Sequence, residues 1–274
     1  MRRCFRMLAV AGLALAAAAC DDDEGTGSRF EPQGRRIFAV DAAGNLLTFG
    51  SQNPQTVRRV AVTGLQSGET LVGLDFRPAN GRLIGLGSSS RVYSVDTLSA
   101  VATVAGTAAF TPALSGAAFG FDFNPTVDRI RVHGSGGQNL RLHPETGVVA
   151  ATDAALSYMA GDAGAGTTPQ ISGTAYTNSV AGAASTILFA IDSNRDVLTR
   201  VGDANAGIMT TVGPLGVNTT TDAGFDIVGI NEAYASLTVG GQSELYTINL
   251  STGAATRVAR IGGGSPVRGI AVAP

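Results

Sequence analysis

One four-residue pattern recurs along the chain and limits the folds that this sequence can adopt. Each copy has a glycine, an apolar residue, an aspartate or small residue, and a second apolar residue. Successive copies lie about 50 residues apart, which is within the range for the blades of propeller proteins. The pattern therefore predicts a chain built from several equivalent units. Its internal copies are Gly73-Leu74-Asp75-Phe76, Gly120-Phe121-Asp122-Phe123, Gly173-Thr174-Ala175-Tyr176 and Gly224-Phe225-Asp226-Ile227.

Each copy is followed by further short segments that are typical of strands. In the first unit these segments cover residues 82–86, 92–96 and 102–106, and the last unit has equivalents at 245–249 and 255–258. Four short strands per unit is the strand content of a propeller blade. No apolar face of 3.6-residue period extends beyond a turn or two after the N-terminal region, so the predicted fold class is all-β.

The two ends of the repeat region complement each other. Gly269-Ile270-Ala271-Val272 is a fifth opening segment with no later strands, whereas residues 36–41, 46–49 and 59–62 form a unit that lacks its opening segment. Pairing the ends would complete five blades and remove free sheet edges. We therefore predict a five-bladed β-propeller over residues 35–274, closed by its N- and C-terminal strands. A β-sandwich or a solenoid is the alternative.

The residues before this domain have the layout of a secretory signal. Arg2, Arg3 and Arg6 precede an uncharged run at residues 7–19, which ends in alanines before Cys20. The run is shorter than the roughly 20 residues of a membrane-spanning helix. Residues 15–20 resemble a bacterial lipobox, whose cysteine becomes lipid-modified, although alanine replaces the preferred leucine at position 17. Cleavage at the same alanines without lipidation is the alternative.

These features predict an exported, lipid-anchored protein of the cell envelope. Residues 1–19 are expected to be a signal peptide, Cys20 the acylated residue, and residues 20–34 a flexible acidic tether. The expected partners are a lipid bilayer, contacted through the acylated Cys20, and an envelope protein or a glycan as ligand. The sequence leaves open whether the inner or the outer membrane holds the protein.

Composition excludes several function classes. Acidic residues outnumber basic ones, 21 to 19, which disfavours nucleic acid as a partner. The chain has no lysine and only Cys4 and Cys20 as cysteines, so Schiff-base chemistry and thiolate metal sites are excluded from the predicted domain. The two histidines, His133 and His143, lack catalytic partners at motif spacing, and we interpret both as surface or turn residues.

The repeat itself supplies a candidate cation site. Asp75, Asp122 and Asp226 share one repeat position, which Ala175 and Ala271 occupy in the other two units. Equivalent positions of a closed ring converge toward its axis, so three carboxylates would meet there and would favour a cation such as Ca²⁺ or a raised pKa. The alternative is that each aspartate accepts hydrogen bonds from the turn of its own blade.

A second polar group is a candidate anion or ligand site. Strand alternation places Arg129 and Arg131 on one face, and arginine suits carboxylate or phosphate ligands. Pairing of these arginines with Asp128 or Asp122 is the interpretation that we favour. The oxygen-rich run at residues 192–196 lacks the glycine and the closing glutamate of a calcium loop, which indicates a turn. The complete group is Arg129, Arg131, Gln138, Asn139 and Arg141.

The central part of the chain also carries a family resemblance. The relevant runs are Phe121-Asp122-Phe123-Asn124-Pro125, Asp128-Arg129-Ile130-Arg131-Val132 and Gln138-Asn139-Leu140-Arg141-Leu142, followed by Thr152-Asp153. They resemble the bacterial family catalogued as domain of unknown function 4394, over most of the chain from about Arg35 to Pro274. The resemblance implies an exported, propeller-like protein and no particular activity.

No catalytic residue set is complete, and fold alone does not specify chemistry. The expected function is therefore that of a membrane-tethered lipoprotein whose non-catalytic propeller binds a ligand or a protein. The alternative is a glycan hydrolase of the five-bladed propeller type, which would use axial carboxylates. A third hypothesis is an assembly lipoprotein that holds a partner at the membrane.

Overall fold

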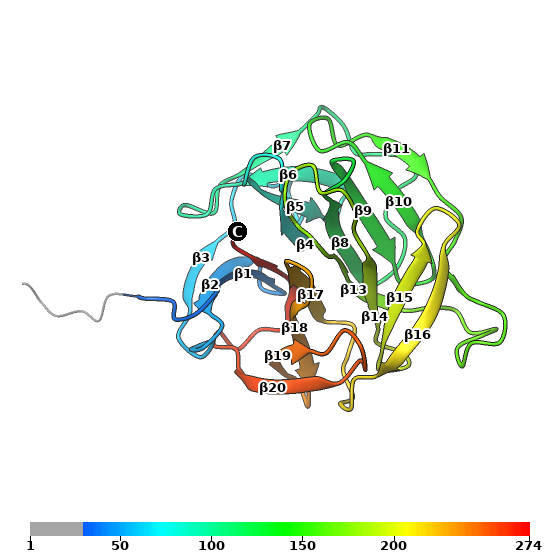
Figure 1. Ribbon diagram of the computed structural model, residues 1–274. Coiled ribbons are helices and arrows are strands. Elements are labelled where there is room, and N and C mark those ends of the chain that lie inside the picture. Colours follow the sequence, from blue (N-terminus) through cyan, green and yellow to red (C-terminus); the bar gives the residue numbers. More distant parts are fainter. Residues whose placement is uncertain (1–29) are drawn as a thin grey trace, which may run out of the picture.

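The computed structural model describes residues 30–274. All regular elements in this range are β-strands, and they form five sheets arranged around one axis (Figure 1). The prediction of an all-β, five-bladed β-propeller is confirmed. The predictions for residues 1–19 and for Cys20 lie outside the described residues.

Each sheet is one blade, and the opening strands of the five blades contact one another around the axis. Blade 1 contains β21 (Val267–Val272), β1 (Arg36–Asp41), β2 (Asn45–Gly50) and β3 (Arg58–Ala61). Blade 2 contains β4 (Leu71–Phe76), β5 (Leu83–Gly87), β6 (Arg91–Val95) and β7 (Ala102–Ala105). Blade 3 contains β8 (Phe119–Asn124), β9 (Arg129–Gly134), β10 (Asn139–Leu142) and β11 (Val149–Thr152).

The four main strands of each remaining blade follow the same antiparallel order. Blade 4 contains β13 (Ile171–Tyr176), β14 (Leu188–Asp192), β15 (Val197–Asp203), β16 (Ile208–Pro214) and the short β12 (Ser157–Tyr158). Blade 5 contains β17 (Ala223–Val228), β18 (Glu232–Val239), β19 (Gln242–Ile248) and β20 (Ala255–Arg260). Apolar residues at alternate strand positions fill the spaces between blades. In the part of the chain that the structure describes, no helix has the length and apolar character needed to cross a membrane.

Blade 1 joins the two ends of the described chain, as the repeat predicted. Strand β21 pairs antiparallel with β1, with Ile37 opposite Val272 and Ala39 opposite Ile270. All four of these residues are buried in one apolar cluster. The last strand therefore completes the first blade, and the ring has no free edge at the junction.

Blade 4 departs from the four-strand prediction. The chain between β11 and β13 is long, and its residues Ser157 and Tyr158 add a fifth strand that pairs parallel with the outer strand β16. Tyr158 is buried there and donates a hydrogen bond to Asp192 Oδ2 over 2.6 Å. The added strand covers a sheet edge that would otherwise be open to solvent.

The repeat glycines allow the opening strands to approach closely. A Cβ atom at Gly120 would lie 2.0 Å from Thr174 Oγ1 in the next blade, and one at Gly224 would lie 2.6 Å from the backbone nitrogen of Ile270. Only a residue without a side chain fits such spacing. The cavity between the opening strands at this level measures only about 10 Å³. The opening strands therefore leave almost no open space at this level.

Candidate functional site

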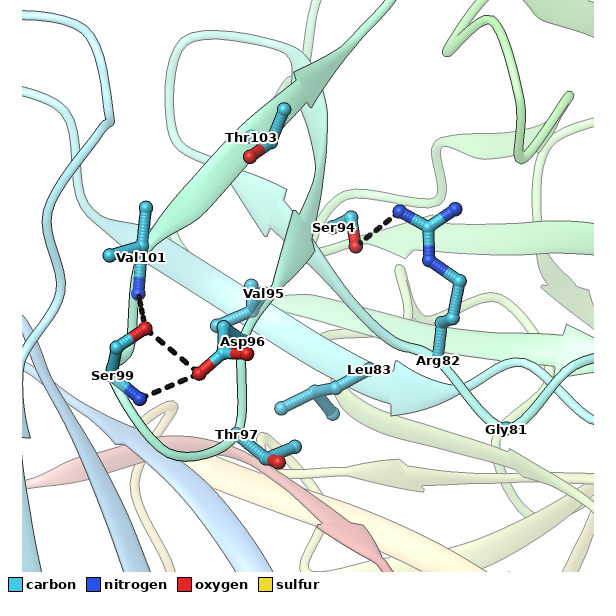
Figure 2. A pocket seen from close by; sticks show the side chains of 10 residues that line it. All are labelled: Gly81, Arg82, Leu83, Ser94, Val95, Asp96, Thr97, Ser99, Val101 and Thr103. Atoms are coloured by element: carbon cyan, nitrogen blue, oxygen red, sulfur yellow. Dashed lines mark hydrogen bonds between the residues drawn. The ribbon is translucent and has the colours of Figure 1, made fainter.

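A hollow of about 560 Å³ lies on blade 2 near Arg82 and Asp96 (Figure 2). Four of its polar side chains are paired with each other by hydrogen bonds. Arg82 Nη2 donates to Ser94 Oγ over 2.8 Å, and Ser99 Oγ donates to Asp96 Oδ1 over 2.8 Å. These side chains stabilise local turns and strands, so the hollow lacks polar groups that converge on a ligand.

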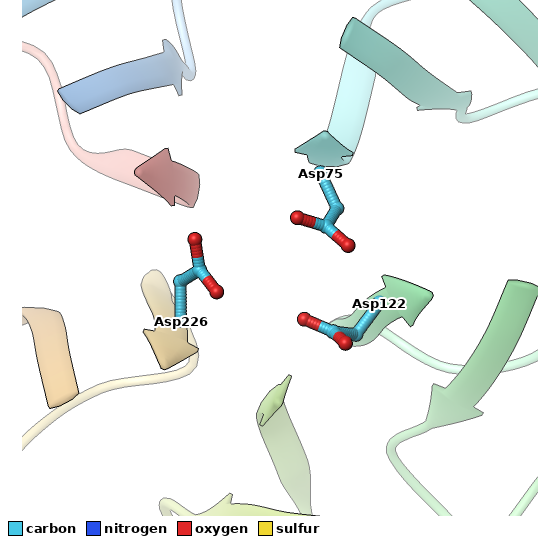
Figure 3. A group of neighbouring side chains, drawn as sticks. All are labelled: Asp75, Asp122 and Asp226. Carbon is cyan, nitrogen blue, oxygen red and sulfur yellow. The ribbon is translucent and has the colours of Figure 1, made fainter. Parts of the chain in front are cut away.

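The three repeat aspartates meet on the axis, beyond the narrow level set by the glycines. Asp75, Asp122 and Asp226 lie near the ends of β4, β8 and β17 and point toward one another (Figure 3). One carboxylate oxygen from each lies within 4.8 Å of the other two. The exposed fractions of the residues are 6%, 1% and 4%, so the cluster is almost removed from solvent.

Five backbone N–H groups, one from each blade, surround this cluster, and the aspartates accept hydrogen bonds from all of them. Three donors belong to the blade that follows the aspartate. The other two donors lie in β4 and β17, where the preceding blade carries alanine (Ala271 or Ala175) at the repeat position. Each of these donors bonds to the aspartate of its own strand. The bonds run from Phe76 N (2.6 Å) and Phe123 N (2.9 Å) to Asp75, from Tyr176 N (3.1 Å) to Asp122, and from Ile227 N and Val272 N (2.6 Å each) to Asp226.

The alternative that each aspartate serves the turn of its own blade is therefore wrong. The carboxylates bond to strand residues, and three of the five bonds connect neighbouring blades. Both oxygens of Asp75 and of Asp226 are used in this way, and Asp122 accepts through Oδ1.

Burial raises the pKa of all three carboxyls. The charge of Asp226 adds to the rise in the pKa of Asp75, and the charges of Asp75 and Asp226 add to that of Asp122. Burial raises the pKa of Asp226 to about 6, although its two backbone hydrogen bonds oppose the rise. Within residues 30–274, no arginine or histidine forms an ion pair with these aspartates. Backbone hydrogen bonds therefore offset part of the repulsion and desolvation, and no ion pair within these residues adds to them.

One arginine close to the cluster in the sequence is already held in ion pairs. Arg77 follows β4 and lines the space above the cluster, but Nε and Nη2 donate to the carboxylate of Asp128 over 2.8 and 2.6 Å. Its Nη1 group donates to Glu145. Two carboxylates thus neutralise this guanidinium, and the ion pairs connect blade 2 to blade 3.

An axial pocket of about 430 Å³ opens above the cluster. Asp75 and Asp226 lie at its base, and most other lining residues are apolar. Pockets of this volume and character are typical of small-molecule sites. We refer to this cavity as the axial pocket. Its apolar lining includes Phe76, Pro78, Val180, Val228 and Ala273.

The family model described as Domain of unknown function (DUF4394) matches residues 45–271. The chain belongs to this family. A search of curated proteins finds no match to the sequence.

Solved structures resemble this DUF4394 protein in fold. A Bacteroides thetaiotaomicron protein of unknown function has a TM-score of 0.50 and 9% identity, over 85% of this chain and 55% of that one. PorZ, a surface component of the type-IX secretion system of Porphyromonas gingivalis, has a TM-score of 0.42 and 16% identity, over 83% and 27%. The DUF4394 chain thus spans about half and about a quarter of their respective lengths.

The candidate anion site of the DUF4394 domain does not form as one open site. Arg131 and Arg141 both bind Asp153, with Arg131 Nη1 at 2.5 Å and Arg141 Nε at 2.8 Å from Oδ2. Arg131 also donates to Tyr176, Asn139 and Asn205, which leaves its guanidinium satisfied. Structural pairing is thus correct for Arg131, but its partner is Asp153 and not Asp128 or Asp122.

The other two members of that group lie apart from Arg131. Arg129 donates to the backbone carbonyls of Val127 and Asp128, and Asp128 itself pairs with Arg77. Gln138 bonds to backbone groups of Ala113 and Ser115. These two side chains fix loops. Residues 193–196 form a turn between β14 and β15, as predicted.

His133 is not a surface or turn residue. It lies in β9 with no exposed surface, and its Nδ1 atom is 2.9 Å from Thr174 Oγ1 in blade 4. Burial, aided by the charge of Arg131, lowers its pKa to about 3, so the ring stays neutral in the fold. The repeat glycine Gly120 lies opposite His133 in the neighbouring strand β8. His143 lies in the connection between β10 and β11, as predicted.

The axial carboxyls should make stability decrease as the pH rises. A carboxyl whose pKa is higher in the folded chain stabilises the fold fully below the unfolded value of about 3.9, and this contribution is lost as the pH rises through the folded value. For Asp226 that value is about 6. As the pH rises from 5 to 8, we expect the free energy of unfolding of the wild type, measured by urea denaturation, to fall relative to that of Asp122→Asn.

The comparison between variants isolates this effect. His133 titrates in the unfolded wild type and variant alike, so its contribution cancels. Asp96→Asn is the control, because hydrogen bonds to the exposed Asp96 lower its pKa and it titrates below this window. Equal pH dependence in Asp122→Asn and the wild type would contradict the assignment.

Proposed function

We propose that this protein is a membrane-tethered lipoprotein of the cell envelope whose propeller is a non-catalytic binding domain with its ligand site in the axial pocket. The pocket itself is the observation that supports a binding role. A largely apolar cavity of about 430 Å³ ends at buried carboxylates that have no cationic partner among residues 30–274. Such a cavity favours a ligand that brings positive charge.

The bonding of the carboxylates favours binding over glycan hydrolysis. A glycosidase needs one carboxyl as acid and another as nucleophile or base, and both must reach the substrate. Here both oxygens of Asp75 and of Asp226 hold backbone N–H groups. Release of reducing sugar from an envelope glycan, lost in Asp75→Asn, would instead support the hydrolase.

The binding role is tested by thermal melting of the full chain against three ligand classes: calcium and magnesium, organic amines, and neutral sugars. We expect at least one cation class to raise Tm, because a ligand at about 100 times its Kd adds about 2.7 kcal/mol to the free energy of unfolding. The shift should be smaller in Asp122→Asn and unchanged in Asp96→Asn. A response to sugars alone, or to no ligand, would refute a cation-binding pocket.

The tether rests on the lipobox-like sequence before Cys20, and it is tested by labelling cells with radioactive palmitate. We expect the wild-type protein to carry label and to sediment with membranes, because several acyl chains hold a protein firmly at a bilayer. Cys20→Ala should lose both properties. Cys4→Ala is the matched control, since the predicted cleavage removes Cys4, and it should keep both. Label that persists in Cys20→Ala would refute the tether.

A further inference from the structure

We propose that the end of the propeller around the mouth of the axial pocket docks against a lipid bilayer. This inference rests on the proposed tether at Cys20 and adds the orientation of the domain, in which the axial pocket opens toward the lipid. We call this end the axial face. It consists of the connections after the opening strands and the chain ends at blade 1, which are residues 77–82, 125–128, 177–187, 229–231, 30–35 and 273–274.

Exposed apolar side chains project from the axial face. Val127, Val180 and Ile230 are 55%, 61% and 69% exposed, and each lies in the connection between the first two strands of its blade. The loops that carry Val180 and Ile230 are neighbours, because Asn178 N donates to the carbonyl oxygen of Gly229 over 2.5 Å. Exposed apolar groups around the mouth of a pocket are typical of a surface that contacts a membrane or another molecule.

The turns at the opposite end of the blades carry no such side chains. These turns join the second and third strands of each blade, and they consist of small or polar residues. None of the exposed large apolar side chains of residues 30–274 lies in them. The apolar character of the axial face is therefore a property of one end of the ring. The opposite turns are residues 42–44, 88–90, 135–138, 193–196 and 240–241.

The chain that leads to Cys20 joins the domain at the axial face. Strand β1 is antiparallel to β21 with Ile37 opposite Val272, so β1 begins at the end where β21 finishes. The two residues after β21 line the axial pocket. Arg35, just before β1, donates to the carboxylate of Glu232 over 3.0 and 2.6 Å. Glu232 opens β18, directly after the turn at residues 229–231, so the first described residues are held beside the apolar tips.

The short distance along the chain to Cys20 favours lipid as the occupant of this face. Arg35 follows Cys20 by about 15 residues, and a chain of that length can span at most about 50 Å. An acylated Cys20 would therefore keep the axial face close to the bilayer. Contact then becomes an intramolecular event, so a few apolar tips suffice where a free protein would need a larger surface.

Charge on the axial face is also compatible with phospholipid headgroups. The carboxylate of Asp128 is paired with Arg77. Arg129 forms no ion pair within residues 30–274, and its Nη1 group donates to the carbonyl oxygens of Val127 and Asp128. A positive charge thus lies beside the exposed Val127 side chain. Arginine pairs well with phosphate, which phospholipid headgroups carry.

The test is tryptophan fluorescence of the acylated full chain in phospholipid vesicles. The chain has no tryptophan, so Ile230→Trp places a single reporter on the axial face. Ala43→Trp is the matched control, because Ala43 is exposed in the turn at the opposite end of blade 1. We expect brominated phospholipids to quench Ile230→Trp and its emission to shift to shorter wavelength, because the indole enters an apolar medium. Ala43→Trp should show neither change.

A second substitution tests whether the apolar tips cause the contact. Val180→Asp, added to Ile230→Trp, should remove most of the quenching, because a charged side chain resists transfer into lipid. Ala43→Asp, added in the same way, should leave the quenching unchanged. All three positions are exposed, so these substitutions do not alter the core.

The outcomes separate this inference from the proposed tether. Equal quenching at both positions, quenching at neither, or quenching of Ala43→Trp alone would overturn the docking of the axial face while the chain stays anchored. A shift in the emission of Ile230→Trp that brominated lipid does not quench would assign the face to a protein partner and would overturn it too. Absence of palmitate from Cys20 would refute the tether, and this inference with it.

Discussion

Removal of residues 268–274 should leave the domain unable to fold. The deletion removes nearly all of β21, which carries the buried Ile270 and Val272 and pairs with β1. Each such side chain contributes about 1.5–3 kcal/mol when buried, and each lost hydrogen bond costs about 1 kcal/mol. The sum exceeds about 5 kcal/mol, while whole domains are stable by only about 5–15 kcal/mol. Circular dichroism should show loss of the cooperative melt.

The matched control removes Pro274 alone. This residue is exposed and lies beyond the last paired strand, so its deletion should change Tm little. A truncated chain without residues 268–274 that melts within about two degrees of the wild type would show that the strand does not close the ring.

Replacement of Gly224 by alanine should be among the most damaging single-atom additions to this protein. The new Cβ atom would lie 2.6 Å from the nitrogen of Ile270 and 2.8 Å from backbone carbons of Gly269. Overpacking costs about 1–3 kcal/mol where side chains can move, and here the contacts are backbone atoms of the next blade. We expect a loss of about 3 kcal/mol, which corresponds to a decrease in Tm of roughly 10 °C.

Gly202→Ala is the control for this substitution. Gly202 lies in β15, its added Cβ atom would have no neighbour within 4 Å, and its backbone needs no positive φ. Alanine there should be neutral or stabilising by up to about 1 kcal/mol, because it restricts the unfolded chain. Equal effects of the two variants in urea denaturation would mean that the close approach of the opening strands does not matter for stability.

The fold could be predicted because its main determinants are local and repeat. A glycine followed two residues later by an aspartate or alanine marks each opening strand, and the fifth copy near Gly269 indicated where the ring closes. The strand β12 could not be predicted, because two residues in a long connection carry no periodic pattern. Its position depends on the neighbouring edge of β16, which is a tertiary property.

The candidate site could be predicted in part. A shared repeat position placed Asp75, Asp122 and Asp226 together, since equivalent positions of a ring face its axis. The sequence did not reveal that their hydrogen bonds cross to neighbouring blades, because this depends on the spacing between opening strands. The axial pocket is also invisible in the repeat, since loops of different length, such as the one at Val180, line its mouth.

Blade 1 combines strands from both ends of the domain, and this determines the order in which the fold can be completed. The antiparallel strands of blades 2 to 5 each come from one consecutive stretch of the chain. In blade 1, β1 can pair with β21 only after every other strand in the sequence has been synthesised. During synthesis the edge of β1 is therefore unprotected while the other blades can already form. Contacts between such distant segments form slowly, and open edges at this stage promote association with other chains. Closure is thus expected to be the late, aggregation-sensitive step in the biogenesis of this propeller.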